Sequence, residues 1–395
     1  MYAVMNMGKL EFRESDSDVY SDEQTMPVVG VARPSDTARP VAYERINRCV
    51  YVTEWSEQEH AGTVPGPAKE PMTLALISCH YGGFNELRRD ASIRAFESWD
   101  RQRVKPSEGV FLEVVCPGQA PCFNAEDFPS WLRYTRIYGK ERNANLFQKE
   151  ALWNIGAKLT RSDGMLFLDG DCMPVDTDEY FLRMAAALKP GRCVHAAWHI
   201  IHEGQDERNH DFWSIMATDV LGKPTFPGMG YAMTRADYDN MDGFNPYSIC
   251  GSGDMVFLWE SVKSLHQRIP FARRFHTGLI RPNRPQLEPY AVSGLTVQHN
   301  FHGLKTDRGY VWSRYAVEVF GDPRAYCHID SAGLLAWNDP KFPLRYIVME
   351  KSRMHSRQEL LGLITEVFDR RLREQELLNK EPGYGYDEKD RNIFD

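Results

Sequence analysis

Two carboxylates one residue apart, Asp169 and Asp171, follow the short apolar run 166–168. In an extended backbone, residues i and i+2 point to the same side, so both acids would reach one divalent cation or one polyphosphate. This geometry suits a nucleotide-sugar whose diphosphate is held by a metal ion. A solvated turn at the end of a strand has the same pattern, so the rest of the sequence must decide between a site and a turn.

A second group of candidate ligands lies in the segment 297–310, which reads VQHNFHGLKTDRGY. His299 and His302 are three residues apart, beside Lys305 and Arg308. Two histidines in an extended loop diverge, so we expect one of them to bind an ion, and a purely structural histidine is the alternative. Imidazole with carboxylates suits Mn²⁺ or a similar divalent ion, and the two cations could hold a departing diphosphate.

A third candidate is Asp254, which follows the glycine-flanked stretch 250–253 and precedes a predicted helix over 255–265. A carboxylate at a helix N-terminus is stabilised by the exposed N–H groups and the helix dipole. The position favours either an ionised general base or a structural cap.

The elements that would position these residues begin at Thr73, where strands start to alternate with helices. We predict strands over 74–79, 110–116 and 165–168, and helices over 86–99 and 146–159. This alternation is typical of an α/β fold with a single, mostly parallel sheet and flanking helices. Ligands of such sheets bind at the carboxyl ends of the strands, where Asp169 and Asp171 lie. His80, Asn85 and Arg88 follow the first strand and could touch a nucleotide.

The domain organisation that we expect has three parts. Residues 1–70 form an N-terminal extension with acidic and proline-containing segments, and residues 346–395 form a C-terminal helical tail. Residues 71–345 form the catalytic domain, with a donor half over 71–192 and an acceptor half over 193–345. An apolar stripe on a helix near 357–378 indicates packing.

The composition sets limits on the class of protein. The 395 residues are 42% hydrophobic and 12% aromatic, which indicates a globular chain, and the net charge of −8 gives no general attraction to nucleic acid or anionic membranes. The eight cysteines contain no C-x-x-C pair and are expected to be buried free thiols. No apolar stretch approaches the roughly 20 residues of a membrane helix. We therefore expect no membrane span and a cytoplasmic location.

Together, three ordered motifs resemble those of inverting glycosyltransferases of the A-type fold, namely bacterial or viral members of family 2 and the β-1,4-galactosyltransferases. The resemblance covers about residues 72–345. The motifs are KEALWNIG at 149–156 with FLDGDCMP at 167–174, GYAMTRADY at 230–238 with GFN at 243–245 and Gly253-Asp254, and HNFHGLKTDRGY at 299–310.

Two departures from the family pattern bear on the site. The galactosyltransferases carry Glu-Asp where this chain has Gly253-Asp254. The second predicted strand ends in Cys-Pro-Gly at 116–118 instead of the double Asp common in family 2. Glu113 could replace that uracil contact or be an ordinary strand residue.

The resemblance implies a role for each candidate residue. On the donor side, Asp171 binds Mn²⁺ or Mg²⁺, Asp169 contacts the ion through water or contacts the ribose, and His299 or His302 completes the metal shell. His80, Lys149, Lys305 and Arg308 bind the nucleotide-sugar, with a UDP-sugar as the expected donor. On the acceptor side, Asp254 is the general base, and Gly253, Trp213 and Tyr231 contact the acceptor. Trp198 and Trp312 are further candidates to stack on it.

Several alternatives stay open at this point. A metal-dependent phosphoesterase or nuclease would also use Asp-x-Asp and His-x-x-His, although it would be expected to carry a second metal cluster. A second alternative is a non-catalytic sugar-binding protein with the same fold. The acceptor is a polysaccharide or lipid-linked glycan by default, with protein or the hydroxymethylated bases of phage DNA as alternatives. Neither the sugar nor the oligomeric state follows from the sequence.

Overall fold

The computed structural model describes residues 73–203, 209–217, 223–249, 251–262, 279–302, 322–325 and 327–338, together with the backbone of four short strands within residues 2–54. The predicted C-terminal helix and the segment with Lys305, Arg308 and Trp312 lie outside the described residues.

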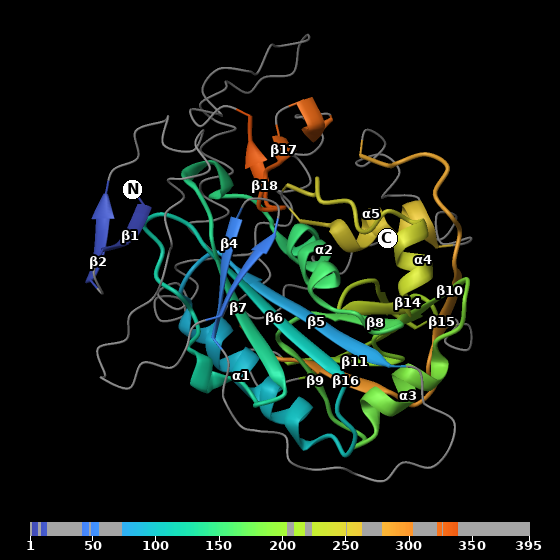
Figure 1. Cartoon of the computed structure of the whole chain (residues 1–395). Helices are drawn as coiled ribbons and strands as arrows, with labels where there is room; N and C mark the ends of the chain where they lie inside the picture. Colours follow the sequence, from blue (N-terminus) through green and yellow to red (C-terminus); the bar gives the residue numbers. More distant parts are fainter. Residues whose placement is uncertain are drawn as a thin grey trace, which may run out of the picture.

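A nine-stranded sheet forms the centre of the fold (Figure 1), in the order β15-β10-β14-β8-β5-β6-β7-β4-β3. The pairs β15–β10, β8–β5, β5–β6 and β6–β7 are parallel, and the other four are antiparallel. It follows that every strand except β14 and β4 runs in the same direction. The predicted α/β class with a mostly parallel sheet is therefore confirmed.

The strands of this sheet are β3 (Ala42–Ile46), β4 (Cys49–Glu54), β5 (Leu74–Tyr81), β6 (Glu108–Val115), β7 (Leu132–Tyr138), β8 (Gly164–Leu168), β10 (Arg192–His195), β14 (Gly230–Thr234) and β15 (Glu288–Ala291). The helices are α1 (Glu86–Arg101), α2 (Lys149–Leu159), α3 (Tyr180–Ala187), α4 (Arg235–Asn240) and α5 (Gly253–Ser261). The strands predicted near 74, 110 and 165 and the helices near 86 and 146 are thus all present, with ends shifted by a few residues.

Helices cover both faces of the large sheet, with α1 and α3 on one side and α2, α4 and α5 on the other (Figure 1). Neighbouring strand residues point to opposite faces, so Leu76 packs in the core with Phe96 of α1, whereas Ile77 packs in the core with Trp153 of α2. Strands that are buried on both faces are near-continuous apolar runs, as in β8.

The structure has a second sheet that the sequence patterns did not predict. Its order is β13-β12-β11-β16-β9, and its strands are β9 (Cys172–Pro174), β11 (His199–Glu203), β12 (Asn209–Ser214), β13 (Thr225–Phe226) and β16 (Thr296–His299). Helix α1 holds β9 by two side-chain bonds: Trp99 Nε1 donates to the Cys172 carbonyl at 2.9 Å, and Ser98 Oγ to the Pro174 carbonyl at 2.7 Å.

Two small hairpins complete the described structure, β1 (Tyr2–Asn6) with β2 (Lys9–Arg13), and β17 (Cys327–Ile329) with β18 (Leu335–Trp337). Strand β4 pairs with β7, so part of the predicted N-terminal extension adds two strands to the large sheet. The cysteines of the described part are free thiols, as predicted. None of the described helices has the length and apolar character needed to cross a membrane.

Candidate functional site

The acidic pair lies in a turn between the two sheets. Strand β8 ends at Leu168, the Cys172 N–H donates to the Asp169 carbonyl at 3.1 Å, and β9 starts at Cys172 in the second sheet. The extended geometry that we predicted for Asp169 and Asp171 is therefore wrong, because the chain turns at these residues. As a result, the two carboxylates have different partners.

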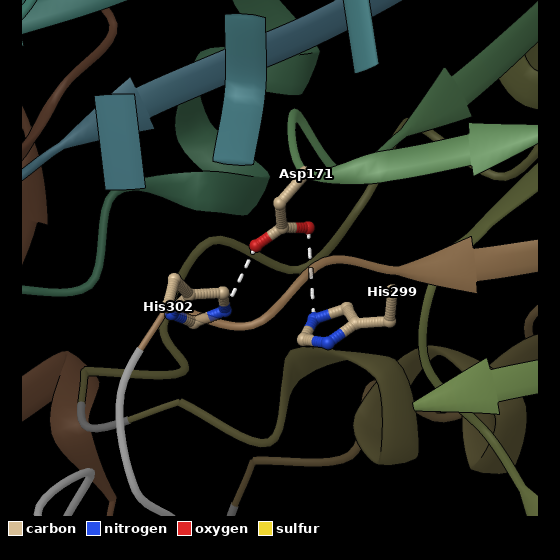
Figure 2. Close-up of side chains that lie close together, drawn as sticks. All are labelled: Asp171, His299 and His302. Carbon is tan, nitrogen blue, oxygen red and sulfur yellow. Dashed lines mark ion pairs between the residues drawn. The ribbon is translucent and has the colours of Figure 1, made fainter. Parts of the chain in front are cut away.

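Asp171 lies against both histidines of the predicted loop (Figure 2). Its Oδ2 is 2.9 Å from His302 Nε2, and its Oδ1 is 3.6 Å from His299 Nε2. The ligand atoms of the three residues lie within 4.8 Å of one another. We expected only one imidazole to reach the ion, but both face Asp171.

The backbone explains why both histidines converge. In the antiparallel pair β16–β9, His299 stands opposite Cys172, and the next N–H, of Asn300, donates to the Asp171 carbonyl at 3.0 Å. The chain then leaves the strand, which brings His302 back toward the same carboxylate.

Further hydrogen bonds fix the segment that carries the histidines. Asn300 Nδ2 donates to the Ala91 carbonyl of α1 at 2.8 Å, and the Phe301 N–H donates to Glu203 Oε2 at 2.7 Å. Arg94 of α1 binds both oxygens of Glu203, at 3.0 and 2.8 Å. Partial burial opposes ionisation of Glu203, but the bonds from Arg94 and Phe301 outweigh it and lower its pKa. The histidine segment is thus held before any ligand binds.

This donor set fits a transition metal ion. One carboxylate oxygen and two imidazole nitrogens suit a first-row transition metal ion such as Fe²⁺ or Mn²⁺, whereas Mg²⁺ prefers oxygen ligands alone. Asp169 is not part of the cluster.

Asp169 and Asp254 meet instead at Lys149, the first residue of α2. The Lys149 ammonium is 3.4 Å from Asp169 Oδ1, and 3.0 and 3.1 Å from the two oxygens of Asp254. Burial alone would lower the pKa of Lys149, but Asp169 and Asp254 raise it well above its usual value. Burial, with repulsion from Asp254 and Asp171, raises the pKa of Asp169 to about 6 despite the attraction of Lys149. Lys149 thus links the predicted donor and acceptor sides.

All these groups line one cleft at the carboxyl ends of β5 and β8. Its lining combines residues from distant segments: Cys79, His80, Tyr81, Arg88, Ser92, Phe147, Lys149, Glu150, Asp169, Gly170, Asp171, Phe226, Gly228, Met229, Gly251, Ser252, Gly253, Asp254, His299 and His302. The predicted residues His80, Lys149, Gly253 and Asp254 are therefore brought together with the cluster of Asp171, His299 and His302. Asp254 lies in the first turn of α5, which starts two residues earlier than predicted.

Backbone strain is concentrated at the same cleft. Five described residues other than glycine have a positive φ. Three are asparagine or aspartate, which tolerate this conformation: Asn145, Asp242 and Asn283. The other two are residue types that rarely adopt it, Met229 (φ 88°) and Ser252 (φ 65°). Both of the latter line the cleft. Such strain persists where the surrounding structure enforces it, and it is frequent at binding and catalytic sites.

Two predicted acceptor contacts lie outside the described lining of the cleft. Tyr231 is fully buried, its ring packs on Phe257, and its hydroxyl donates to the Pro227 carbonyl, so it presents no surface to a ligand. Trp213 belongs to β12, where it packs against His199 and Lys223, and it is not among the described residues that line the cleft.

Two other residues that we considered as nucleotide contacts have structural roles. The Asn85 side chain caps α1 by accepting a hydrogen bond from the Arg88 N–H at 3.0 Å. Glu113 is fully buried on β6 and binds Tyr134, Arg136 and the Cys122 N–H, outside the described lining of the cleft. The structure therefore gives Glu113 the role of a buried strand residue.

Sequence reasoning missed Glu150, a cleft residue on α2 that is 3% exposed. Burial and the negative charge of Asp254 raise its pKa to about 7, against the attraction of Lys149. One signal could have revealed it: at helical spacing, Glu150 falls on the same face as Leu146, Trp153 and Ala157. A charged residue on the apolar face of a helix needs a reason.

The comparisons with known proteins give little further guidance. No protein-family model matches the chain, and no curated protein matches it either. Among solved structures, the chain is similar to a crystal structure of S. aureus TarS 1–349, with 12% identity and a TM-score of 0.37 over 82% of this chain and 78% of that one. It is also similar to the crystal structure of S. aureus TarS 1–349 in complex with UDP, with 13% identity and a TM-score of 0.33 over 64% and 66% of the two chains. Because both TM-scores are low, the geometry of the cleft is the basis for assigning a function.

Proposed function

We propose that residues 71–345 form a metal-dependent glycosyltransferase that moves a sugar from a nucleotide-sugar to a hydroxyl acceptor with inversion. The observation that carries this proposal is the convergence of Asp169, Asp171, His299, His302 and Asp254 in one cleft. These residues come from three distant parts of the sequence. They supply a cation site beside a carboxylate that can accept a proton.

On the donor side, Asp171, His299 and His302 would hold a divalent ion, for which we propose Mn²⁺. When bound, the ion supplies Lewis-acid stabilisation of the diphosphate. We propose that Lys149, Asp169 and His80 bind the nucleotide-sugar, which the motif resemblance indicates to be a UDP-sugar. Lys305 and Arg308, which lie outside the described residues, are proposed to bind the phosphates.

On the acceptor side, Asp254 is the proposed general base. The acceptor hydroxyl gives its proton to an Asp254 oxygen while its own oxygen bonds to the anomeric carbon. The bond from that carbon to the diphosphate breaks, and its electron pair leaves with the diphosphate. Attack from the face opposite the leaving group inverts the anomeric centre. Lys149, which binds both Asp254 oxygens, fixes the orientation of the base.

A donor-hydrolysis panel tests the proposal. UDP-, GDP- and other nucleotide-sugars are incubated with the protein and Mn²⁺, and release of the nucleoside diphosphate is followed with and without a chelator. We expect turnover of a UDP-sugar that chelation abolishes. If no nucleotide-sugar in the panel is consumed, the proposal is wrong.

Substitution of the base separates chemistry from binding. Asp254→Asn should lower transfer by about 100-fold or more, because general-base catalysis typically contributes factors of this size. Binding of UDP with Mn²⁺ should stay close to that of the wild type. Near-normal transfer by Asp254→Asn would remove Asp254 from the mechanism.

The phosphoesterase alternative has less support. Enzymes that hydrolyse phosphate esters with two metals need two adjacent ion sites. The described residues contain one cluster of candidate ligands, Asp171 with His299 and His302. Release of phosphate from simple phosphate esters, without any sugar transfer, would favour the hydrolase instead.

A further inference from the structure

Glu150 is a buried carboxyl group that the proposed reaction does not yet use. It is the second residue of α2, it is 3% exposed, and it lines the same cleft as Asp254. A buried acid of this kind needs either a structural partner or a function.

The position of its carboxylate is set by Gly253, the residue before Asp254. A Cβ atom added to Gly253 would lie 1.8 Å from Glu150 Oε1 and 2.2 Å from Glu150 Cδ. No side chain can therefore occupy position 253 while Glu150 keeps its place. The Glu150 carboxylate fills the space beside Asp254 at the start of α5.

Burial and most of the charges around Glu150 oppose its ionisation, while Lys149 and the backbone N–H of Glu150 favour it. Lys149 faces it from α2, Asp254 from α5, Asp169 from the turn after β8, and the Cys79 thiol from β5. Lys149 already pairs with Asp169 and Asp254. A further buried carboxylate in such a place destabilises the fold, and an apolar side chain would avoid this cost. Destabilising groups of this kind are typical of functional sites.

We propose that Glu150 is a second carboxyl group of the acceptor site. Asp254 takes the proton of the acceptor hydroxyl that reacts, and Glu150 accepts a hydrogen bond from a second hydroxyl of the same acceptor. The inference rests on the proposed function and narrows its substrate class. An acceptor held by two adjacent carboxyl groups must carry a second hydrogen-bond donor beside the reacting hydroxyl, as a saccharide does with its neighbouring hydroxyls. In hydroxymethyluracil the group beside the hydroxymethyl is a carbonyl oxygen, which cannot donate and would leave Glu150 without a partner.

The first experiment compares the two acceptor classes directly. The full-length protein is supplied with its UDP-sugar, Mn²⁺ and either a panel of methyl glycosides or an oligonucleotide that contains hydroxymethyluracil. We expect transfer to a glycoside. Transfer to the oligonucleotide alone, or to neither class while the donor is still hydrolysed, would overturn the inference.

The second experiment tests Glu150 itself with Glu150→Gln, which keeps the shape and removes the charge. Loss of a charge-assisted hydrogen bond should raise KM for the glycoside by about ten-fold and leave donor hydrolysis within about two-fold. The pH dependence of this KM at about pH 7 should also weaken, since Glu150 would no longer ionise. Gly253→Ala should raise the same KM, because its Cβ displaces the Glu150 carboxylate.

The matched control is Glu113→Gln, which changes a buried glutamate of β6 outside the described lining of the cleft. Its KM for the glycoside should equal that of the wild type, and a UDP-induced rise in melting temperature confirms that each variant is folded. A wild-type KM and pH profile in Glu150→Gln would refute the role of Glu150 alone. Absence of donor turnover in the wild type would instead refute the proposed function.

Discussion

The cost of burying Glu150 gives a prediction that needs no substrate. Burial, with the charge of Asp254, raises the pKa of Glu150 from 4.5 to about 7. Because each pKa unit corresponds to about 1.4 kcal/mol, ionising this carboxyl costs the folded state about 3 kcal/mol. Glu150→Gln removes the cost and keeps the side-chain volume.

The sign of the effect follows from which state binds the proton more tightly. Below about pH 4.5 the carboxyl is protonated in both the folded and the unfolded chain, so its raised pKa costs nothing. Between about pH 4.5 and pH 7 the unfolded chain releases the proton while the folded chain keeps it, so the wild type loses stability relative to Glu150→Gln. Above about pH 7 the difference is constant.

Urea unfolding of both proteins at about pH 4.5 and about pH 8 measures this change. The free energy of unfolding of Glu150→Gln, relative to the wild type, should increase by about 3 kcal/mol between the two conditions. Glu97→Gln, an exposed substitution on α1, is the control and should show no such change. The reasoning would be refuted if the difference in the free energy of unfolding between Glu150→Gln and the wild type did not vary with pH.

Three further predictions concern other residues of the cleft. Lys149→Met leaves Asp169 and Asp254 without their shared cation and should lower the free energy of unfolding by about 3–5 kcal/mol at neutral pH; an unchanged urea midpoint would contradict this. Ser252→Gly should raise the free energy of unfolding by about 1 kcal/mol, because glycine adopts the left-handed conformation without strain, and a thermal melt that shows no increase would argue against strain at this site. His302→Ala should weaken Mn²⁺ binding by about ten-fold or more in calorimetry of the metal-free protein, whereas His199→Ala, outside the cluster, should bind Mn²⁺ as the wild type does.

The sequence predicted three strands of the large sheet, β5, β6 and β8, with helices α1 and α2, because these strands and helices have strong and different periodicities. The apolar run of β8 and the stripe of α2 needed no tertiary information. The second sheet was harder to predict, because β9 and β13 are too short for a periodic pattern and form only where β16 and β12 lie beside them. The hairpin β3–β4 joins the sheet through β7, a pairing between segments about 80 residues apart.

The sequence predicted which residue types form the candidate site, but not which of these residues contact one another. The residue types at Asp171, His299, His302 and Asp254 indicated metal and proton chemistry, and these residues do meet in one cleft. Asp169 contacts Lys149 whereas Asp171 contacts the two histidines, because the chain turns at 169–171. The spacing of the two acids in the sequence does not reveal this turn. The position of Tyr231 in the core did not follow from the sequence either, since an aromatic residue in a strand is equally suited to a core and to a sugar contact.

The short connection between β8 and β9 limits how this chain can vary. Only residues 169–171 separate a strand of the large sheet from a strand of the small one. One added residue would shift β9 by one position along β16, and such a shift turns every side chain of a strand to its opposite face. Insertions and deletions in this connection are therefore incompatible with the pairing of β9 with β16, and its length should be kept fixed in any engineered version of the protein.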